Sequence, residues 1–130
     1  MRTVEETLRY AAEKRRDALV FGATLDPEQV TAQLRDCKPA GRWSRLDTRK
    51  QATPPATLRK TLTQVLARGE QAHVTLTSDA SAELLDELVA ALQDPQRSPG
   101  AMVVVSVTTR YLRQLETDLR PHFAICAGDE

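Results

Sequence analysis

Short apolar runs alternate with amphipathic stretches along this chain of 130 residues, and this alternation restricts its fold more than any other feature. The runs at 18–22, 73–77 and 101–107 have the length and composition of buried strands. In the stretches between them, apolar residues recur every three or four positions, as they do on the inner face of a helix. Strands and helices that alternate form right-handed crossovers, so the pattern predicts a mainly parallel sheet.

The predicted elements form one α/β domain that spans residues 1–130. We expect a three-layer, open sheet of about five strands with helices on both faces, similar to P-loop and Rossmann-like folds. The run 101–107 contains four valines and hardly alternates, which is typical of a central parallel strand. The expected helices lie at 3–16, from Asp26 to Cys37, from 53 to Gly69, at 81–93 and at 108–119. The expected strands lie at 18–22, around Trp43–Thr48, at 73–77, at 101–107 and at 123–126. Residues 128–130 are expected to form a frayed tail.

Composition predicts a soluble protein of the cytoplasm. Hydrophobic residues make up 41% of the chain and charged residues 28%, which is an ordinary balance for a globular domain. No apolar run approaches the ~20 residues of a membrane-spanning helix, and the acidic, amphipathic start does not resemble a secretory signal. Cys37 and Cys126 have no motif spacing, so we expect reduced thiols. Many Arg and Ala residues with only four lysines suggest a GC-rich bacterial genome.

Charge is unevenly distributed, although the net charge is zero. Residues 1–60 contain 13 Lys or Arg and 8 Asp or Glu, whereas residues 61–130 contain 5 and 10. The basic excess concentrates in 38–60, where seven cations stand against Asp47 alone. This segment is a candidate surface for a polar partner or for head-to-tail self-association, and a solvated loop explains it equally well. The candidate contact residues are Lys38, Arg42, Trp43, Arg45, Arg49 and Lys50.

Polar residues after three predicted strands mark the place where a ligand site would lie. Open α/β sheets bind ligands at the carboxyl ends of strands, and Thr24, Asp79 and Thr108 occupy such positions. A nucleotide hydrolase also needs a loop of the form G-x-x-x-x-G-K-[ST] after the first strand. Here the segment 22–29 reads GATLDPEQ, which lacks the second Gly, the Lys and the Ser/Thr and carries two carboxylates at a helix start. We therefore predict a vestigial ligand site, no catalytic residue and no cofactor.

Other chemistries lack residues that they require. A phosphoacceptor site at Asp79 would need an acidic pair after the first strand and a Lys after the last, and both are missing. We therefore expect Asp79 to be the N-cap of the helix at 81–93. The two histidines have no metal-ligand spacing, and His73 is expected to be a half-buried strand residue. Cys126 and His122 are an even number of positions apart, so they would lie on the same face of a strand. This alone would bring them close only by chance, so no nucleophile pair is predicted.

Several segments resemble the core of FtsK/HerA-type DNA-pumping ATPases, a family that includes conjugative coupling proteins. The segment 79–85 is similar to their hydrolysis strand tip and following helix, 104–110 to their next strand, and 119–123 to the segment in which an arginine precedes their last strand. Gly22-Ala23-Thr24 matches the opening of their phosphate loop, so the likeness covers roughly 18–126.

One departure from that family concerns catalysis directly. Ala80 stands where the family has the glutamate that activates water, in addition to the missing phosphate-loop residues. The resemblance therefore implies an inactive relative that keeps the fold. Because subunits of such motors pack in rings, it also implies docking against an active ATPase or a DNA-transfer assembly.

The leading hypothesis is a non-enzymatic α/β module that binds a protein partner through 38–60 or through the acidic helices 81–93 and 111–119. The alternative is an accessory protein that binds nucleic acid, with the cations of 38–60 on phosphates and Trp43 stacked on a base. The neutral net charge and the acidic second half favour the first hypothesis, in which Trp43 anchors its loop as a hydrophobic residue. A third hypothesis is a nucleotide or small-molecule binder at the strand ends.

Overall fold

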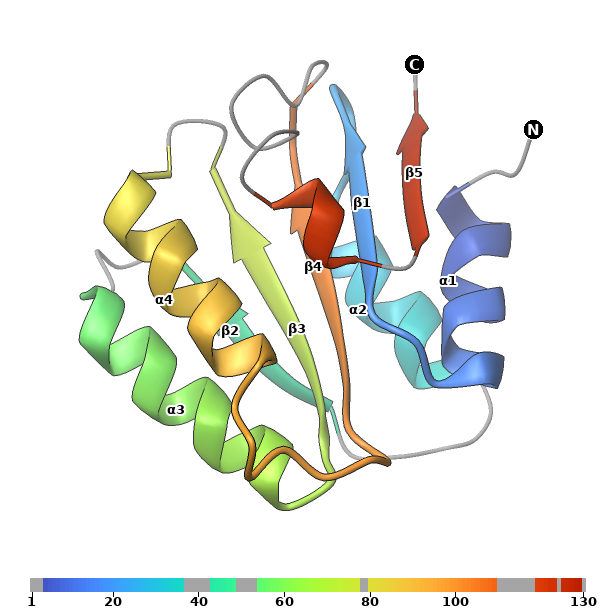
Figure 1. Cartoon of the computed structure of the whole chain (residues 1–130). Helices are drawn as coiled ribbons and strands as arrows, with labels where there is room; N and C mark the ends of the chain where they lie inside the picture. Colours follow the sequence, from blue (N-terminus) through green and yellow to red (C-terminus); the bar gives the residue numbers. More distant parts are fainter. Residues whose placement is uncertain are drawn as a thin grey trace.

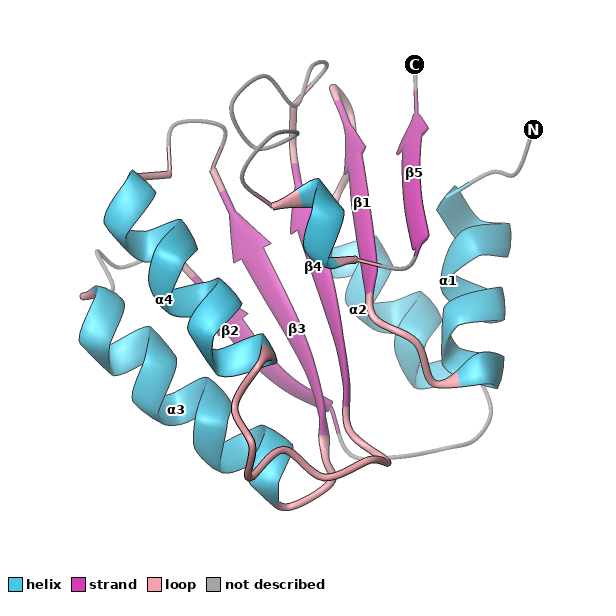
Figure 2. Ribbon diagram, in the orientation of Figure 1, coloured by secondary structure: helices cyan, strands magenta, loops and turns pink. Residues whose placement is uncertain are grey.

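A computed structural model of the protein describes residues 4–36, 43–48, 54–77, 80–109, 119–123 and 125–129. A parallel sheet lies between two layers of helices, as Figure 1 and Figure 2 show, so the predicted three-layer α/β fold is confirmed. No helix within the described residues has the length and apolar character to cross a membrane. The elements are α1 (Val4–Lys14), β1 (Ala18–Gly22), α2 (Pro27–Asp36), β2 (Trp43–Asp47), α3 (Pro55–Ala67), β3 (Gln71–Leu76), α4 (Ala82–Leu92), β4 (Met102–Val107), the 3-10 turn η1 (Arg120–His122) and β5 (Ile125–Asp129).

All five strands run parallel, in the order β2-β3-β4-β1-β5. β4 lies in the centre and every one of its residues is buried, which confirms the prediction made from its valines. β1 lies between two late strands, because Leu19 pairs with Val105 of β4 on one side and with Cys126 of β5 on the other. β2 forms one edge of the sheet, as the sequence around Trp43 predicted.

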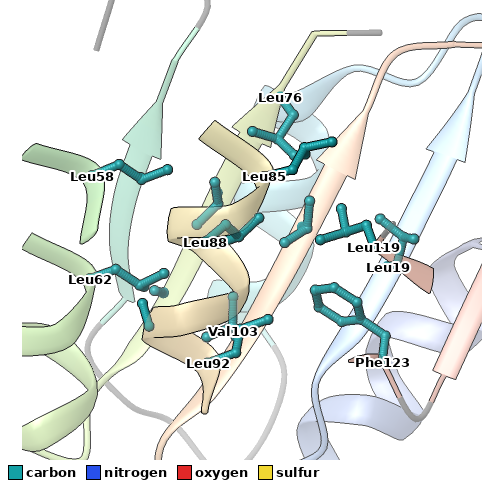
Figure 3. Close-up of a cluster of buried hydrophobic side chains, with 14 of the residues drawn as sticks. Leu19, Leu58, Leu62, Leu76, Leu85, Leu88, Leu92, Val103, Leu119 and Phe123 are labelled. Carbon is teal, nitrogen blue, oxygen red and sulfur yellow. The ribbon is translucent and has the colours of Figure 1, made fainter. Parts of the chain in front are cut away.

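The α3/α4 core fills the space between the sheet and helices α3 and α4 (Figure 3). Strand residues that face it are apolar and fully buried, for example Leu19, Val74 and Val105. Figure 3 shows Leu62 of α3 and Leu88 of α4 directed toward these strands, and both are 0% exposed. Burying a leucine side chain contributes about 1.5–3 kcal/mol, so this core supplies much of the stability of the domain.

The α1/α2 core lies on the opposite face of the sheet and is smaller. It consists of Leu8, Ala11, Ala18, Val20, Val30, Leu34, Met102 and Val104. The half-buried Trp43 packs against this cluster from β2. This packing matches the interpretation of Trp43 as a hydrophobic anchor.

The cap predicted after α3 is confirmed, whereas the cap predicted before α4 is wrong. Gly69 follows α3 with a φ of 75°, the left-handed conformation expected for a glycine that terminates a helix. α4 begins after Ser81, whose side-chain oxygen accepts a hydrogen bond from Leu84 N at 3.1 Å. The prediction of Asp79 as N-cap is therefore wrong, because the Ser81 hydroxyl already occupies that role. Asp79 itself lies outside the described residues.

The segment after β4 differs from the prediction of a helix at 108–119 and a strand at 123–126. Thr108 is not helical, Leu119 is fully buried in the α3/α4 core, and 110–118 lie outside the described residues. Phe123 ends the η1 turn instead of starting a strand, because Pro121 within that turn fixes a local bend. Its ring packs into the α3/α4 core, which explains why an apolar residue stands there.

The last strand lies further along the chain than predicted. β5 begins at Ile125, and Gly128 and Asp129, which the sequence suggested would fray, pair with Phe21 and Gly22 of β1. Backbone pairing with β1 satisfies the hydrogen-bonding groups of this segment without any apolar side chain at its end. For this reason the hydrophobicity of the sequence gave no sign of it.

Candidate functional site

The connection between β1 and α2 lies at the carboxyl end of the sheet, where ligands bind in open α/β folds. It consists of 23–26 alone. Asp26 caps α2 twice, because its Oδ1 accepts a hydrogen bond from Glu28 N at 3.0 Å and its carbonyl oxygen accepts one from Val30 N at 3.1 Å. Pro27 has no N–H, so three of the first four helical positions offer no free N–H to a phosphate. The start of α2 is closed by the protein itself.

Of the three residues predicted to form a vestigial ligand site, the structure describes two. Thr24 is exposed in the turn after β1, and Thr108 follows β4. Thr108 Oγ1 donates a hydrogen bond to the carbonyl oxygen of Leu25 at 2.9 Å and thereby ties the end of β4 to the β1–α2 connection. Asp79 lies outside the described residues.

The basic segment is described only around β2 and the start of α3, and Arg45 of β2 is not a free cation. Its Nη1 lies 2.6 Å from Glu28 Oε1 and its Nη2 lies 3.2 Å from Asp47 Oδ2. Two carboxylates therefore neutralise this guanidinium, and its buried Nε has no hydrogen-bond partner among the described residues. Arg45 joins β2 to α2. The other predicted contact residues of this segment that lie outside the described part are Lys38, Arg42, Arg49 and Lys50.

A buried chain of hydrogen bonds under α2 was missed by the sequence analysis. His73 lies inside β3 and is 1% exposed, so the prediction of a half-buried residue at the start of the strand is wrong. Its Nδ1 is 2.8 Å from Thr31 Oγ1 of α2, and its Nε2 is 2.7 Å from Ser106 Oγ of β4. Ser106 Oγ in turn donates to Thr75 Oγ1 at 3.5 Å. A neutral imidazole accepts at one nitrogen and donates at the other, so it can satisfy both neighbours.

The opposite, amino-terminal end of the sheet is fastened by an ion pair. Arg97, in the α4–β4 connection, binds both carboxylate oxygens of Asp17, at 2.8 Å from Nη1 to Oδ2 and 2.5 Å from Nη2 to Oδ1. Arg97 also donates to the carbonyl oxygens of Leu92 and Ala101, at 3.1 and 3.2 Å. Asp17 Oδ1 accepts a further hydrogen bond from Val103 N at 2.9 Å. The four terminal N–H groups of the guanidinium are thereby used, so this pair acts as a structural clasp.

His122 and Cys126 belong to different environments. His122 lies in η1, where its Nδ1 is 3.2 Å from Gln93 Nε2, whereas the half-buried Cys126 packs against the α3/α4 core from β5. The two residues do not share a strand face, because His122 lies in the η1 turn and not in an extended strand. Across the described ranges, no group of three His, Cys, Asp or Glu side chains is arranged as a metal site requires.

Comparison with solved structures identifies the fold as a P-loop-like α/β fold. Two variants of RuvB from Thermotoga maritima, a P-loop AAA+ ATPase, match with a TM-score of 0.63 each, at 15% and 14% sequence identity. The match covers 95% of this chain but only 42% of each RuvB chain. No protein-family model and no curated protein sequence matches the chain. The predicted P-loop-like fold is confirmed, and these neighbours do not support the narrower resemblance to FtsK/HerA ATPases.

Proposed function

We propose that this chain is a non-catalytic α/β module that binds a protein partner. The proposal rests mainly on the closed start of α2, where Asp26 takes the place that a bound phosphate would need. The chain also lacks the phosphate-loop Lys and Ser/Thr, and it has Ala80 where hydrolases of this kind carry a glutamate. A domain that keeps the fold without these groups is left with its surfaces as its means of action.

Two surfaces of opposite charge are the candidate contacts. The basic segment 38–60 keeps several cations besides Arg45, whose charge is already neutralised by carboxylates. α4 carries Glu83 and Asp86 as exposed side chains on its outer side. Charge-complementary surfaces steer association and exclude wrong partners. We assign the contact to a protein that is complementary to one of these two surfaces.

The absence of catalysis is tested by ATP hydrolysis and by nucleotide binding. We expect background hydrolysis, and we expect that millimolar ATP with Mg²⁺ leaves the melting temperature of the protein unchanged, because a ligand that binds only the folded state would raise it. The Asp79→Asn variant should behave as the wild type does. Hydrolysis above background that this variant abolishes would refute the non-catalytic assignment.

The contact surface is tested by recovering partners with the tagged chain from its own host, with and without nuclease. One variant carries Arg42→Glu, Arg49→Glu and Lys50→Glu, and it leaves Arg45 in place because reversing it would unbalance Glu28 and Asp47. A second variant carries Glu83→Lys and Asp86→Lys on α4. The matched control carries Glu5→Lys and Glu13→Lys on the exposed side of α1. A nuclease-resistant partner that the control retains and one of the two variants loses is the expected result.

Two outcomes would contradict this assignment of surfaces. Equal recovery in all variants would show that neither surface is the interface. Recovery of nucleic acid alone, lost on nuclease treatment, would favour the alternative function, for which binding should weaken steeply with salt because phosphate contacts release counterions. The packing of Trp43 against the α1/α2 core argues against a free stacking platform for bases.

The narrower kinship with DNA-pumping ATPases belongs to this proposal as well. If the partner is an active ATPase ring or a DNA-transfer assembly, this chain acts as an inactive relative that docks on it. The chain covers only 42% of RuvB, so the whole activity of RuvB is not carried over to it. Mass spectrometry of the nuclease-resistant fraction identifies the partner, and the absence of any such ATPase from it would dismiss this docking role.

A further inference from the structure

A cleft of about 640 Å³ lies at the amino-terminal end of the sheet, away from the closed start of α2. The amino-terminal end of the sheet points downward in Figure 1, where the end of α1 and the α4–β4 connection both lie. Residues of these two segments line the cleft, and η1 contributes His122 to the lining. The volume falls within the range of small-molecule sites, roughly 300–1,000 Å³. Neither the FtsK/HerA resemblance nor the proposed function uses this cleft.

The clasp between Asp17 and Arg97 forms the rigid part of the cleft lining. Both side chains line the cleft, yet their hydrogen bonds to each other and to the backbone already satisfy them. Their charges cancel, so they add no net attraction for a ligand. They hold the α4–β4 connection against the start of β1, and this fixes the wall opposite α1.

Three consecutive cations, Lys14, Arg15 and Arg16, close the cleft from the end of α1. Lys14 and Arg16 are exposed, and within the described part of the chain their side chains make no hydrogen bond or ion pair. Arg15 Nη1 makes only a long contact of 3.4 Å to the carbonyl oxygen of Gly100. Four cations and two carboxylates line the cleft in total, which leaves a net charge of +2.

The backbone at Arg15 is strained in a way that stability alone does not explain. Its φ is 53°, and the hydrogen bonds from Arg15 N to Ala12 O and from Arg16 N to Ala11 O form the turn that usually ends a helix with glycine. A side chain in this left-handed conformation costs free energy that glycine avoids. Strain of this kind is a reason to look for a function of the side chain, and here the side chain lines the cleft.

Neutral donors complete the opposite wall. Because the amide nitrogen of Gln93 only donates, His122 Nδ1 accepts its hydrogen bond at 3.2 Å, and a neutral His122 then carries its proton on Nε2. Gln93 keeps a second N–H, and the Ser98 hydroxyl is a further donor in the lining. The one carboxylate outside the clasp, Asp94, accepts a hydrogen bond from Gln96 N at 2.8 Å. The free groups of the cleft are therefore mostly donors.

We propose that this cleft binds a multiply charged phosphate anion. A single carboxylate offers two oxygens and one charge, which is too little for three cations and several neutral donors in one cleft. A diphosphate offers more oxygens and more charge, and arginine matches its geometry through paired hydrogen bonds. The phosphate belongs either to a small molecule or to a nucleic-acid backbone, and the measurements below separate these two sources.

The test is calorimetric titration of the whole chain with inorganic pyrophosphate. Wild-type protein should bind it, and the Lys14→Glu and Arg16→Glu variants should bind about tenfold more weakly or worse, as expected when a charge-assisted hydrogen bond is lost. Lys60→Glu is the matched control, since Lys60 is also an exposed helical lysine but lies on α3. This control should bind as the wild type does.

The Arg15→Gly variant separates binding from folding. Glycine removes the strain at this position, so the melting temperature should stay the same or rise, while pyrophosphate binding should weaken about tenfold. A purely structural role for Arg15 predicts no change in binding. Such an unchanged affinity, together with unchanged binding by Arg16→Glu, would overturn the proposal.

Two further titrants identify the source of the phosphate. Tighter binding of a single-stranded oligonucleotide than of pyrophosphate, with the same dependence on Arg16, supports a nucleic-acid backbone, and the reverse order supports a small phosphorylated ligand. Binding of a polyglutamate peptide without binding of pyrophosphate would refute phosphate as the ligand. Absence of heat with pyrophosphate, or equal weakening by Lys60→Glu, would also refute it.

Discussion

The two faces of the sheet are buried to a similar depth but are built by different chemistry. On the α3/α4 face, the buried residues of β1, β3 and β4 are all apolar, such as Leu19, Val74 and Val105. Alternate residues of a strand point to opposite faces of the sheet, so β3 buries His73 and Thr75 on the α1/α2 face. Ser106 of β4 lies on the same face and hydrogen-bonds to both. Apolar contacts have no direction, whereas hydrogen bonds do. We infer that the hydrogen bond between Thr31 and His73 fixes the position of α2 on the sheet. The positions of α3 and α4 depend instead on the buried apolar area and on the fit between side chains.

The largest expected effect comes from cutting into the apolar face. Leu88→Ala removes a fully buried side chain from the α3/α4 core and should lower the free energy of unfolding by about 2–5 kcal/mol. Leu34→Ala on α2 is the counterpart in the smaller core, where Leu34 is 1% exposed. Urea unfolding of both variants measures the difference. A loss below about 1 kcal/mol for Leu88→Ala would contradict the view that this face supplies much of the stability.

An intermediate effect is expected on the polar face. His73→Leu removes the partner of the buried Thr31 hydroxyl and leaves the Ser106 hydroxyl with only its long bond of 3.5 Å to Thr75 Oγ1. An unsatisfied buried group costs about 1–3 kcal/mol. The triple variant Thr31→Val, His73→Leu and Ser106→Ala also removes the two hydroxyls that bond to His73, and it should recover most of that loss. The free energies of unfolding of the single and triple variants decide the point. A triple variant no more stable than His73→Leu would show that packing, and not hydrogen bonding, governs this face.

The smallest effect is expected from the ion pairs on the surface of each face. Arg59 Nη1 lies 3.3 Å from Glu87 Oε2 between α3 and α4, with the two side chains 50% and 29% exposed. Solvent screens such a pair, so a double-mutant cycle with alanine should give a coupling of about 0.2–1 kcal/mol. The same cycle on Arg45 and Glu28 samples the other face. A coupling energy well above this range for only one of the two pairs would show that the two faces also differ in the strength of their ion pairs.

The fold could be predicted because its signals are local. Runs of apolar residues and helical periodicity lie within single elements, and Asp26 with Pro27 marks the start of α2 through groups that are adjacent in sequence. The central place of β4 followed from its four valines, since a strand covered on both faces has no reason to alternate. The same locality explains the error at Phe123. Its apolar side chain resembled a strand residue, but Phe123 caps the η1 turn and β5 begins only at Ile125.

The polar features that need the tertiary structure escaped prediction. His73 meets Thr31 across 42 positions of sequence and Ser106 across 33, so no pattern near His73 announces its partners. Arg45 read as a surface cation because Glu28, which neutralises it, lies on a different element. The run of Lys14, Arg15 and Arg16 was visible in the sequence, but only the fold brings it to the α4–β4 connection.

The pairing of β1 has a consequence for the protein while it is being synthesised. Of the five strands of this sheet, β1 leaves the ribosome first, yet Ala18 pairs with Val104 and Ile125, which emerge much later. During most of translation, β1 therefore has no neighbouring strand, and its apolar side chains and unpaired backbone groups are exposed to aggregation and to chaperones. Closing such long-range parallel contacts is also the slow step in folding of this kind. The nascent chain thus depends on the arrival of β4 before its central sheet can assemble.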